Sequence, residues 1–283
     1  MKVAIIGYGF VGKALHNGFK GSVETFLVDP KLNTTVTDLK SFSPDIVFIC
    51  VPSPMNNDGS QDLTIINSVV IEIQASLIKS QIVIKSTILP DAILGISKEI
   101  PDVVYNPEFL REMHADEDFI NSEIIVFGGE DHSAKKIAKF YEHHTNCINK
   151  NYHLTDLITA SMIKYTINSF LATKVIFFNE IFNIFQNLSK EGNWLKFIEI
   201  IASDKRIGNS HMSVPGHDNR FGFGGACLPK DCLALINYAN ELGSPVAIIE
   251  KSVEINNTIR AKYKNKTKRE LDQNIKFNAQ EKE

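Results

Sequence analysis

The feature that most constrains this chain is a glycine-rich turn directly after its first apolar run. Val3–Ile6 is apolar throughout, and Gly7–Gly12, which follows it, reads G-Y-G-F-V-G and opens a helical pattern. In such a strand, turn and helix unit, the glycines allow a tight turn, the approach of a pyrophosphate to the backbone, and close packing of the helix on the strand. Asp29 ends the next apolar run, where a carboxylate can bind an adenosine ribose and repel a 2′-phosphate. The pattern predicts a Rossmann-type unit that binds NAD through Gly7, Tyr8, Gly9, Phe10, Val11, Gly12 and Asp29.

The first half of the chain alternates short aliphatic runs with stretches of helical spacing. This is the pattern of βαβ units that feed a parallel sheet, and strands that are apolar over nearly their whole length are typical of a sheet covered on both faces. The pattern predicts an α/β, doubly wound domain over residues 1–150. The expected strands are Val3–Ile6, Thr25–Val28, Ile46–Cys50, Ile82–Lys85, Val103–Tyr105 and Ile124–Phe127, and the expected helices are Val11–Phe19, Leu63–Ile78 and Ala134–Tyr141.

The second half is predicted to be all-helical. Leu154–Leu188 contains neither Pro nor Gly and has apolar residues at helical spacing, so we expect one long helix. Polar side chains such as Lys164 and Asn168 interrupt its apolar surface, which argues against a membrane span and for packing against other helices or a second copy of the chain. The prediction is a helical central domain over residues 151–262, with further helices at Asn193–Ala202, Lys230–Glu241 and Val246–Lys262, followed by a charged, flexible tail over residues 263–283.

Composition excludes several classes of protein and of site. The chain has 283 residues and a net charge of −3, which gives no reason to expect nucleic acid or an anionic membrane as a partner. Its 4 cysteines form no CxxC pair, so neither a zinc site nor a disulfide framework is indicated. His143, His144 and Cys147 lack a fourth ligand at a usual spacing, and we expect no metal site. The short apolar start differs from a secretory signal, so a reducing, cytoplasmic location is expected.

A second glycine-rich segment places one cysteine in a reactive setting. Phe221–Asp231 reads F-G-F-G-G-A-C-L-P-K-D, a loop that runs into a helix with Pro229 in its first turn. Cys227 is therefore expected at a helix N-terminus beside Lys230, where backbone amides and an ammonium both favour the thiolate that attacks a carbonyl carbon. Cys50 and Cys232 lie in apolar patterns and are predicted to be core residues.

Two further groups of polar residues are candidates for chemistry. Lys164 and Asn168 lie on one face of the predicted long helix, where a cation and an amide can hold an oxyanion together. Asn106–Glu112 follows the end of a strand, where open α/β sheets bind ligands, and offers carboxylates for general-base chemistry. Each pattern alone is also compatible with an ordinary solvated helix face or charged loop.

Together these motifs resemble those of the UDP-glucose/GDP-mannose 6-dehydrogenase family. The resemblance extends in order from Met1 to about Asn257, and its most specific parts are Asn106–Glu112 and Gly222–Asp231. The other matching parts are Gly7–Gly12, Val51–Pro54 with Gly59, Asp62 and Leu63, Ser86 with Thr87, Lys164 with Asn168, and Arg206–Asn209.

The resemblance implies an NAD-dependent, four-electron oxidation of a nucleotide-sugar C6 alcohol to a carboxylate. UDP-glucose is the expected substrate and UDP-glucuronate, for polysaccharide biosynthesis, the expected product. In the family pattern Asp231 and Lys164 help to remove the hydroxyl proton. Cys227 then adds to the resulting aldehyde, so that a second oxidation leaves a thioester.

The same resemblance assigns hydrolysis and binding. Glu108 activates the water, Thr87 helps to hold it, and Asn168 joins the lysine of the long helix in stabilising the oxyanion. Arg206 resembles an arginine that reaches into the site of a partner subunit, and the long helix would form the core of a homodimer. The other residues implied for the sugar nucleotide, besides Glu108, Lys164 and Asn168, are Phe109, Leu110, Arg111, Phe221 and Gly224, and those implied for NAD are Pro52, Thr87 and Lys230.

Two alternatives stay open at this stage. A two-electron hydroxyacid dehydrogenase also combines a Rossmann domain, a long helix and a Lys/Asn pair, but it has no use for the nucleophile Cys227. A non-catalytic NAD- or nucleotide-binding module is the other, because family members usually continue into a further domain that binds uridine diphosphate. The intact spacing of the proposed catalytic residues favours a working short form. The motifs do not distinguish UDP-glucose from GDP-mannose or N-acetylated hexosamine substrates.

Overall fold

The computed structural model describes residues 1–188 and 192–277. They form two compact units, which are described separately. The first consists of Met1–Ser53 with Asp62–Lys164, and the second of Pro54–Gln61 with the described residues from Tyr165 onward. The boundary on the long helix thus lies at Lys164, whereas the sequence analysis places it at residue 150.

The first unit is built on a seven-stranded sheet in the order β2-β1-β3-β4-β5-β6-β7. All neighbouring strands are parallel except β5 and β6, which pair antiparallel. The strands are β1 (Lys2–Ile6), β2 (Glu24–Val28), β3 (Ile46–Ile49), β4 (Gln81–Ile84), β5 (Val104–Tyr105), β6 (Ile125–Gly128) and β7 (Tyr152–Thr155). The six strands expected from the sequence are confirmed with shifts at their ends, and β7 is an addition.

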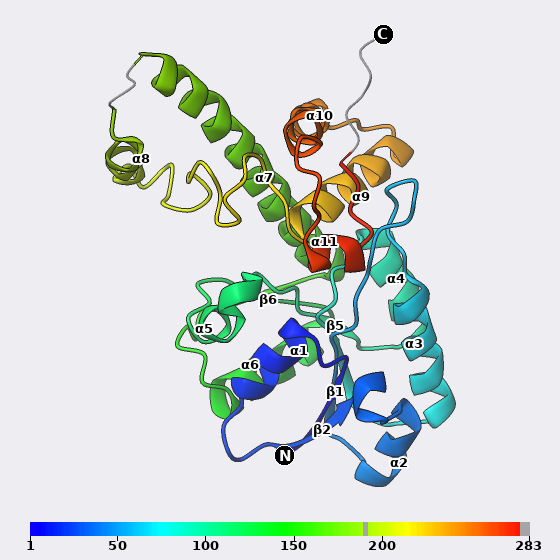
Figure 1. Cartoon of the computed structure of the whole chain (residues 1–283). Helices are drawn as coiled ribbons and strands as arrows, with labels where there is room; N and C mark the ends of the chain where they lie inside the picture. Colours follow the sequence, from blue (N-terminus) through cyan, green and yellow to red (C-terminus); the bar gives the residue numbers. More distant parts are fainter. Residues whose placement is uncertain (189–191, 278–283) are drawn as a thin grey trace. The chain divides into compact units, whose positions relative to one another are not determined.

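Helices cover both faces of this sheet because successive side chains along a strand point to opposite sides. Ala4 and Ile6 of β1 belong to one core, with α3 and α4, and Val3 and Ile5 belong to the other, with α1, α5 and α6. Figure 1 shows these two groups of helices on opposite sides of the strands. The helices of this unit are α1 (Phe10–Asn17), α2 (Leu39–Phe42), α3 (Thr64–Ser76), α4 (Pro90–Glu99), α5 (Ala115–Ile120) and α6 (Asp131–His144), with 3-10 turns at Pro30–Leu32, Val36–Asp38 and Glu112–His114. The predicted doubly wound α/β domain is confirmed.

The described part of the second unit is helical. The 32-residue helix α7 (Leu157–Leu188) contributes its first turns to the first unit and its remainder to the second, which confirms the long helix predicted from the sequence. Ala172 and Ile176 of α7 pack with Val253 of α10 in one apolar cluster, and Phe178 packs with Trp194 of α8 in another. The other helices are α8 (Trp194–Ala202), α9 (Leu228–Glu241), α10 (Ala247–Arg260) and α11 (Lys268–Asp272).

The described part of the predicted charged tail contains a short helix, α11, and residues that are buried in the second unit. α11 begins with a capping box, and Glu270 and Ile275 are buried in the second unit. Asn274 donates from its side chain to the carbonyl of Met55 at 3.0 Å, so this segment is tied to the loop of residues 54–61. The prediction of a solvated tail is therefore wrong for Glu270, Gln273 and Ile275, which are buried. The prediction failed because most residues of this segment are charged or polar, and the few that are buried do not stand out in the sequence. Residues 278–283 of the predicted tail lie outside the described residues.

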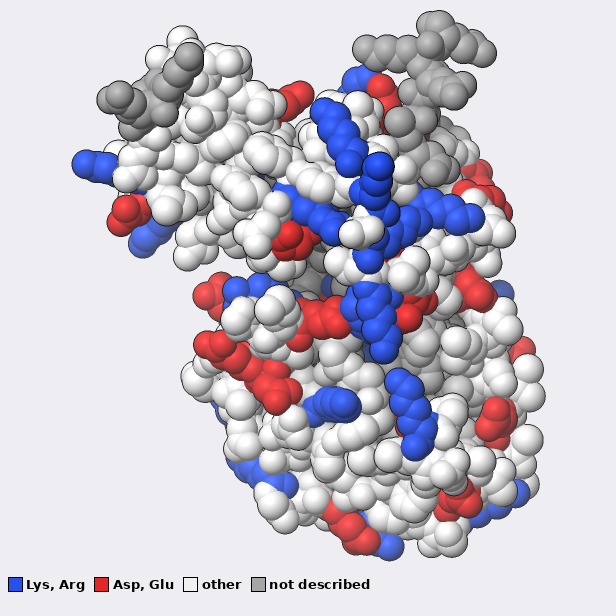
Figure 2. Space-filling view, viewed as in Figure 1, with Lys and Arg blue, Asp and Glu red and all other residues white. Residues whose placement is uncertain are grey.

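The surface carries both signs of charge. On the face drawn in Figure 2, Lys and Arg side chains and Asp and Glu side chains both reach the surface. Among the described residues, none of the helices combines the length and the apolar character that a membrane span requires.

Candidate active site

The glycine turn after β1 has the local geometry of a dinucleotide-binding loop. It lies where the strand order reverses between β1 and β3, the place at which open α/β sheets bind ligands. Gly7 has φ +93°, and its N–H donates to the carbonyl of Val28 at 2.8 Å. The N–H of Tyr8 donates to Asp29 Oδ2 at 2.8 Å, which holds the predicted ribose-binding carboxylate next to the turn. Phe10 begins α1, directly after this turn.

The three glycines differ in the space around them. A Cβ on Gly12 would lie 2.2 Å from the carbonyl oxygen of Gly7, and a Cβ on Gly7 would lie 2.8 Å from the backbone of Cys50. A Cβ on Gly9 would meet nothing within 4 Å. The chain itself therefore requires glycine at positions 7 and 12, whereas Gly9 leaves open space in which a pyrophosphate can approach the backbone. These residues fit NAD.

This difference predicts that two alanine substitutions separate folding from NAD binding. Gly9→Ala should keep the thermal stability of the protein and weaken NAD binding by about tenfold or more, because only the ligand meets the new methyl group. Gly12→Ala should lower both the thermal stability and the affinity for NAD, since the methyl group clashes with the carbonyl oxygen of Gly7. Thermal unfolding with and without NAD measures both effects. Equal loss of stability in the two variants would contradict this account of the turn.

A buried lysine fixes the carboxylate proposed to activate water. Lys85 follows β4, its side chain is 1% exposed, and its Nζ lies 2.5 Å from Glu108 Oε2. The same Nζ donates to Asn106 Oδ1 at 2.7 Å and to the Tyr141 hydroxyl oxygen at 3.0 Å. The Tyr141 hydroxyl in turn donates to Asn106 Oδ1 at 2.7 Å. Glu108 is thus a carboxylate held by a buried cation at the edge of the sheet where β4 and β5 end.

Lys164 contacts the same segment. Its Nζ donates to the carbonyl oxygen of Glu108 at 2.5 Å and lies 5.1 Å from the centre of the Phe109 ring. Arg111 is exposed and binds Asp118 through Nη2 at 2.6 Å and Nε at 3.0 Å. The first unit therefore holds the lysine proposed for proton removal against the backbone of the loop that carries the proposed base.

The remaining site candidates of the first unit lie at the ends of its strands and in the loops that follow. The carbonyl of Thr87 accepts a hydrogen bond from the Ser53 hydroxyl at 2.8 Å, which joins the loops after β3 and β4. Pro52 is exposed beside it, and Leu110 packs at the margin of the core that contains α1, α5 and α6.

In the second unit, Cys227 is the N-cap residue of α9, as the sequence predicts. Its carbonyl accepts from the N–H of Asp231 at 2.9 Å, and its side chain is half-buried. Cys50, Cys147 and Cys232 are buried. Burial raises the pKa of the Cys50 and Cys232 thiols to about 12, so both stay protonated at neutral pH. Of the four thiols, Cys227 is the one with the exposure that a nucleophile needs.

Asp231 lies in the first turn of α9 and is 1% exposed. Its Oδ2 accepts from Asn168 Nδ2 at 2.6 Å, and its Oδ1 binds Lys230 Nζ at 2.6 Å. The sequence analysis pairs Asn168 with Lys164 as a joint oxyanion site. The structure gives each of them its own partner, Asp231 and the carbonyl of Glu108 respectively. The Lys230 ammonium, expected beside the Cys227 thiol, likewise forms an ion pair with Asp231.

The remaining substrate candidates have different surroundings. The Arg206 side chain is 87% exposed and bonds to Asp204, while the carbonyls of the next two residues accept from the buried Lys174. Phe221 packs edge-on to Phe182 with ring centres 5.6 Å apart. The arginine is thus exposed on a loop that Lys174 of α7 binds.

Two buried networks in the structure were not predicted from the sequence. In the first network, Lys85 is predicted only as the last residue of the strand Ile82–Lys85. A lysine that directly follows a buried aliphatic run is an unusual core residue, and this was the available signal. The second network involves Arg260, in the last helix predicted for the central domain, and Glu270, in the tail predicted to be solvated. Its available signal was the T-K-R-E pattern of Thr267–Glu270, a capping box.

Comparison with known proteins assigns the chain to a family. The model for the NAD-binding domain of the UDP-glucose/GDP-mannose dehydrogenase family matches residues 16–145, and the model for its central domain matches residues 158–258. The chain belongs to this family. NAD is accordingly the cofactor of the first unit, in agreement with the geometry of the glycine turn.

Relatives and solved structures of the UDP-glucose/GDP-mannose dehydrogenase family extend the comparison. UDP-glucose 6-dehydrogenase TuaD of Bacillus subtilis is 30% identical over 90% of this chain, which spans 62% of the length of that protein. A UDP-glucose dehydrogenase structure from Pyrobaculum islandicum matches with a TM-score of 0.75 and 26% identity, over 91% of this chain and 68% of that one. GDP-mannose dehydrogenase of Pseudomonas aeruginosa matches with a TM-score of 0.62 and 25% identity, over 93% of this chain and 70% of that one.

Proposed function

We propose that this chain oxidises the C6 alcohol of a nucleotide sugar to a carboxylate in an NAD-dependent, four-electron reaction, with UDP-glucose as the substrate. The observation that carries the proposal is the half-buried Cys227 at the N-terminus of α9, in a chain whose other cysteines are buried. A two-electron alcohol dehydrogenase has no step for a nucleophilic thiol, whereas the oxidation of an aldehyde to an acid requires a tetrahedral adduct from which hydride can leave. UDP-glucose is proposed over GDP-mannose because the curated relative named above is a UDP-glucose 6-dehydrogenase, and because the UDP-glucose dehydrogenase structure matches with a TM-score of 0.75 against 0.62 for the GDP-mannose dehydrogenase structure.

The first oxidation removes a proton and a hydride from the C6 alcohol. NAD, when bound, accepts the hydride. We assign the removal of the hydroxyl proton to Lys164 and Asp231 acting through water, which gives the 6-aldehyde. Lys164 is buried and tied to the carbonyl of Glu108, and Asp231 is buried between Asn168 and Lys230. Both groups are therefore fixed before substrate arrives, which lowers the entropic cost of orienting them.

The second oxidation proceeds on the enzyme. Cys227 Sγ forms a bond to the aldehyde carbon, and Lys164 with Asn168 stabilises the oxyanion of the thiohemiacetal. Loss of a second hydride, which a second molecule of NAD would accept, leaves a thioester. A water activated by Glu108 and held by Thr87 adds to the thioester, the carbon–sulfur bond breaks, and the thiolate and the carboxylate product are released.

The proposed contacts to the sugar nucleotide and to NAD follow the same assignment. The residues proposed to contact the sugar nucleotide are Glu108, Phe109, Leu110, Arg111, Lys164, Asn168, Arg206, Phe221 and Gly224, and those proposed for NAD beyond the glycine turn are Asp29, Pro52, Thr87 and Lys230.

A cytoplasmic location is also part of the proposal. It agrees with the free cysteines, which a reducing compartment keeps reduced.

The stoichiometry of NAD reduction tests the proposal. With a panel of UDP- and GDP-sugars, we expect two NADH per sugar consumed and a carboxylate product, with the highest rate for UDP-glucose. One NADH per molecule of a hydroxyacid would instead support a two-electron dehydrogenase. NAD binding without any reduction of NAD would support a binding module.

We also propose that the chain acts as a homodimer through α7. Phe170, Phe177 and Ile184 recur every seven residues on this helix, and their exposed fractions are 63%, 55% and 55%. Residues at this spacing lie along one face of a helix, and an exposed apolar face of this kind is typical of an interface. A second copy of the chain is the occupant we propose, with Arg206 reaching the partner's site.

This stripe predicts a change of assembly in one variant. Phe177→Glu should weaken self-association by roughly 30-fold or more, because it places a charge in the middle of the apolar stripe. Leu242→Glu is the matched control, since Leu242 is 58% exposed and lies at the end of α9. Sedimentation velocity should show a dimer for the control and a monomer for Phe177→Glu. A dimer of unchanged affinity in both variants would exclude this face as the interface.

A further inference from the structure

The segment at the end of the described chain contacts the loop that carries the proposed nucleophile. We propose that Arg260 and Glu270 are positioning residues that fix the backbone of Gly222–Cys227, and that α11 is required for the reactivity of Cys227 for this reason. We call the set Asn179, Asp218, Asn256, Arg260 and Glu270 the loop clamp. The inference rests on the proposed function, in which Cys227 is the nucleophile.

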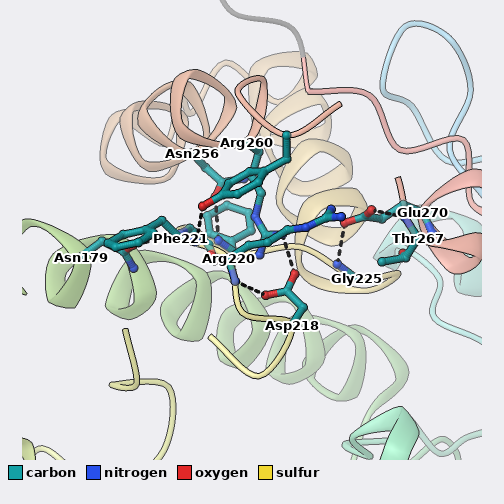
Figure 3. A network of polar contacts seen from close by, with 12 residues as sticks. Asn179, Asp218, Arg220, Phe221, Gly225, Asn256, Arg260, Thr267 and Glu270 are labelled. Carbon is teal, nitrogen blue, oxygen red and sulfur yellow. Dashed lines mark hydrogen bonds and ion pairs between the residues drawn. The ribbon is translucent and has the colours of Figure 1, made fainter. Parts of the chain in front are cut away.

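Glu270 binds the loop from α11. It is 0% exposed, and its Oε1 accepts from the N–H of Gly225 at 3.2 Å. Its Oε2 accepts from the N–H of Thr267 at 2.7 Å, and the Thr267 hydroxyl accepts from the N–H of Glu270 at 3.2 Å (Figure 3). A carboxylate is expensive to bury, so a fully buried one is retained for the bonds that it makes. Here those bonds join the loop to the start of α11.

Arg260 binds the same loop from α10. Its side chain is 2% exposed, its Nη1 lies 2.6 Å from Asp218 Oδ2, and its Nη2 donates to the carbonyl of Gly222 at 2.9 Å (Figure 3). The N–H of Gly222 donates to Asn179 Oδ1 at 2.9 Å. Both backbone polar groups of Gly222 are thus bound by side chains from other elements of the second unit.

The next residues of the loop are held in the same way. The N–H of Phe223 donates to Asn256 Oδ1 at 2.7 Å. A Cβ on Gly224 would lie 2.7 Å from Arg260 Nη1 and 2.7 Å from Glu270 Oε1. The backbone therefore passes between a buried guanidinium and a buried carboxylate, and a side chain at position 224 would displace one or both of these groups.

The loop needs such external support because of its composition. Gly222 and Gly225 have φ values of +72° and +77°, which glycine adopts readily but does not hold by itself. Apart from Phe223, the loop has no large apolar side chain that could anchor it before Cys227. The loop clamp supplies this order through hydrogen bonds, and it sets the position at which the chain enters α9 and presents the thiol.

The test compares two charge-neutralising substitutions on one short helix. Glu270→Gln keeps the size of the side chain but turns one acceptor into a donor, so that one of its two backbone hydrogen bonds is lost. Asp272→Asn is the control, because Asp272 lies on the same helix and is exposed. Hydrogen exchange of the Gly222–Cys227 amides is measured by mass spectrometry. The two oxidations are measured separately, with the nucleotide sugar and with its 6-aldehyde.

We expect Glu270→Gln to increase the rate of hydrogen exchange in Gly222–Cys227 by about tenfold and to leave exchange of the α10 amides unchanged. Oxidation of the aldehyde should slow by about tenfold, while the rate of the first oxidation and the KM for NAD stay within about twofold of the parent values. Asp272→Asn should match the parent protein. Unchanged exchange would overturn the proposal, and so would exchange that rises throughout the second unit with both oxidations falling together. If the parent protein oxidises no nucleotide sugar, the proposed function fails, and the exchange result alone still decides whether Glu270 orders the loop.

Discussion

Cys227→Ala should form no carboxylate product, with a rate at least about 1,000-fold below that of the parent protein. The reason is that the thiohemiacetal cannot form without the thiol. This tetrahedral adduct is the species from which the second hydride leaves. The first oxidation needs no thiol and should persist, so that NADH per sugar falls from two towards one. Because Cys227 is half-buried at a helix end, its truncation should change the free energy of unfolding by less than about 1 kcal/mol.

Cys232→Ala is the matched control for this variant, since Cys232 lies on the same helix and is 0% exposed. It should retain acid formation and lose about 1 kcal/mol of stability through the small cavity that it creates. Steady-state NADH formation, product analysis and urea unfolding measure these effects. Acid formation at the parent rate in Cys227→Ala would show that the nucleophile is misassigned.

Lys85→Met should lower the free energy of unfolding by about 3–5 kcal/mol, the usual effect of removing one partner of a buried ion pair. Lys85 and Glu108 have side-chain exposures of 1% and 11%, and Nζ also donates to Asn106 and Tyr141. Without the ammonium, Glu108 is left as an uncompensated carboxylate, the Tyr141 hydroxyl oxygen loses the hydrogen bond that it accepts from Lys85, and Asn106 Oδ1 keeps only the one from Tyr141. Urea unfolding of the pure protein measures the loss.

A double variant separates the ion pair from the packing of the lysine. Lys85→Met with Glu108→Gln removes both charges, so it should recover about half or more of the stability lost in Lys85→Met, because no isolated charge remains buried. If the double variant is as unstable as the sum of the two single variants, Lys85 and Glu108 are not energetically coupled. The hydrogen bonds to Asn106 and Tyr141 would then account for the effect.

Much of the first unit could be predicted because its signals are local. A short continuous apolar run such as Ile46–Ile49 is typical of a strand covered on both sides, and the glycine turn is recognised without any distant partner. β7 was missed for the opposite reason. Tyr152–Thr155 lies at the sheet edge, its two central residues His153 and Leu154 are exposed, and none of its side chains is buried, so neither its hydrophobicity nor its length stands out.

The candidate site was predictable where chemistry is encoded in a motif and not where it depends on tertiary contacts. The position of Cys227 at a helix end follows from the glycines before it and Pro229 after it. The contact between Asn168 and Asp231 could not be predicted from the sequence, because these residues meet only when α7 and α9 pack together. Glu270 was missed because a charged residue in a charged segment is usually solvated, and only folding shows that this carboxylate is fully enclosed.

The covalent state of Cys227 during turnover tests the central claim most directly. Glu108→Gln should slow hydrolysis more than either oxidation, so that the acyl group stays on the enzyme. When this variant is incubated with NAD and UDP-glucose, quenched in acid and digested, the peptide that contains Cys227 should carry the mass of a UDP-glucuronyl thioester, and the adduct should be absent from Cys227→Ala. An unmodified Cys227 peptide from a variant that has formed NADH, or an adduct on another residue, would contradict the account.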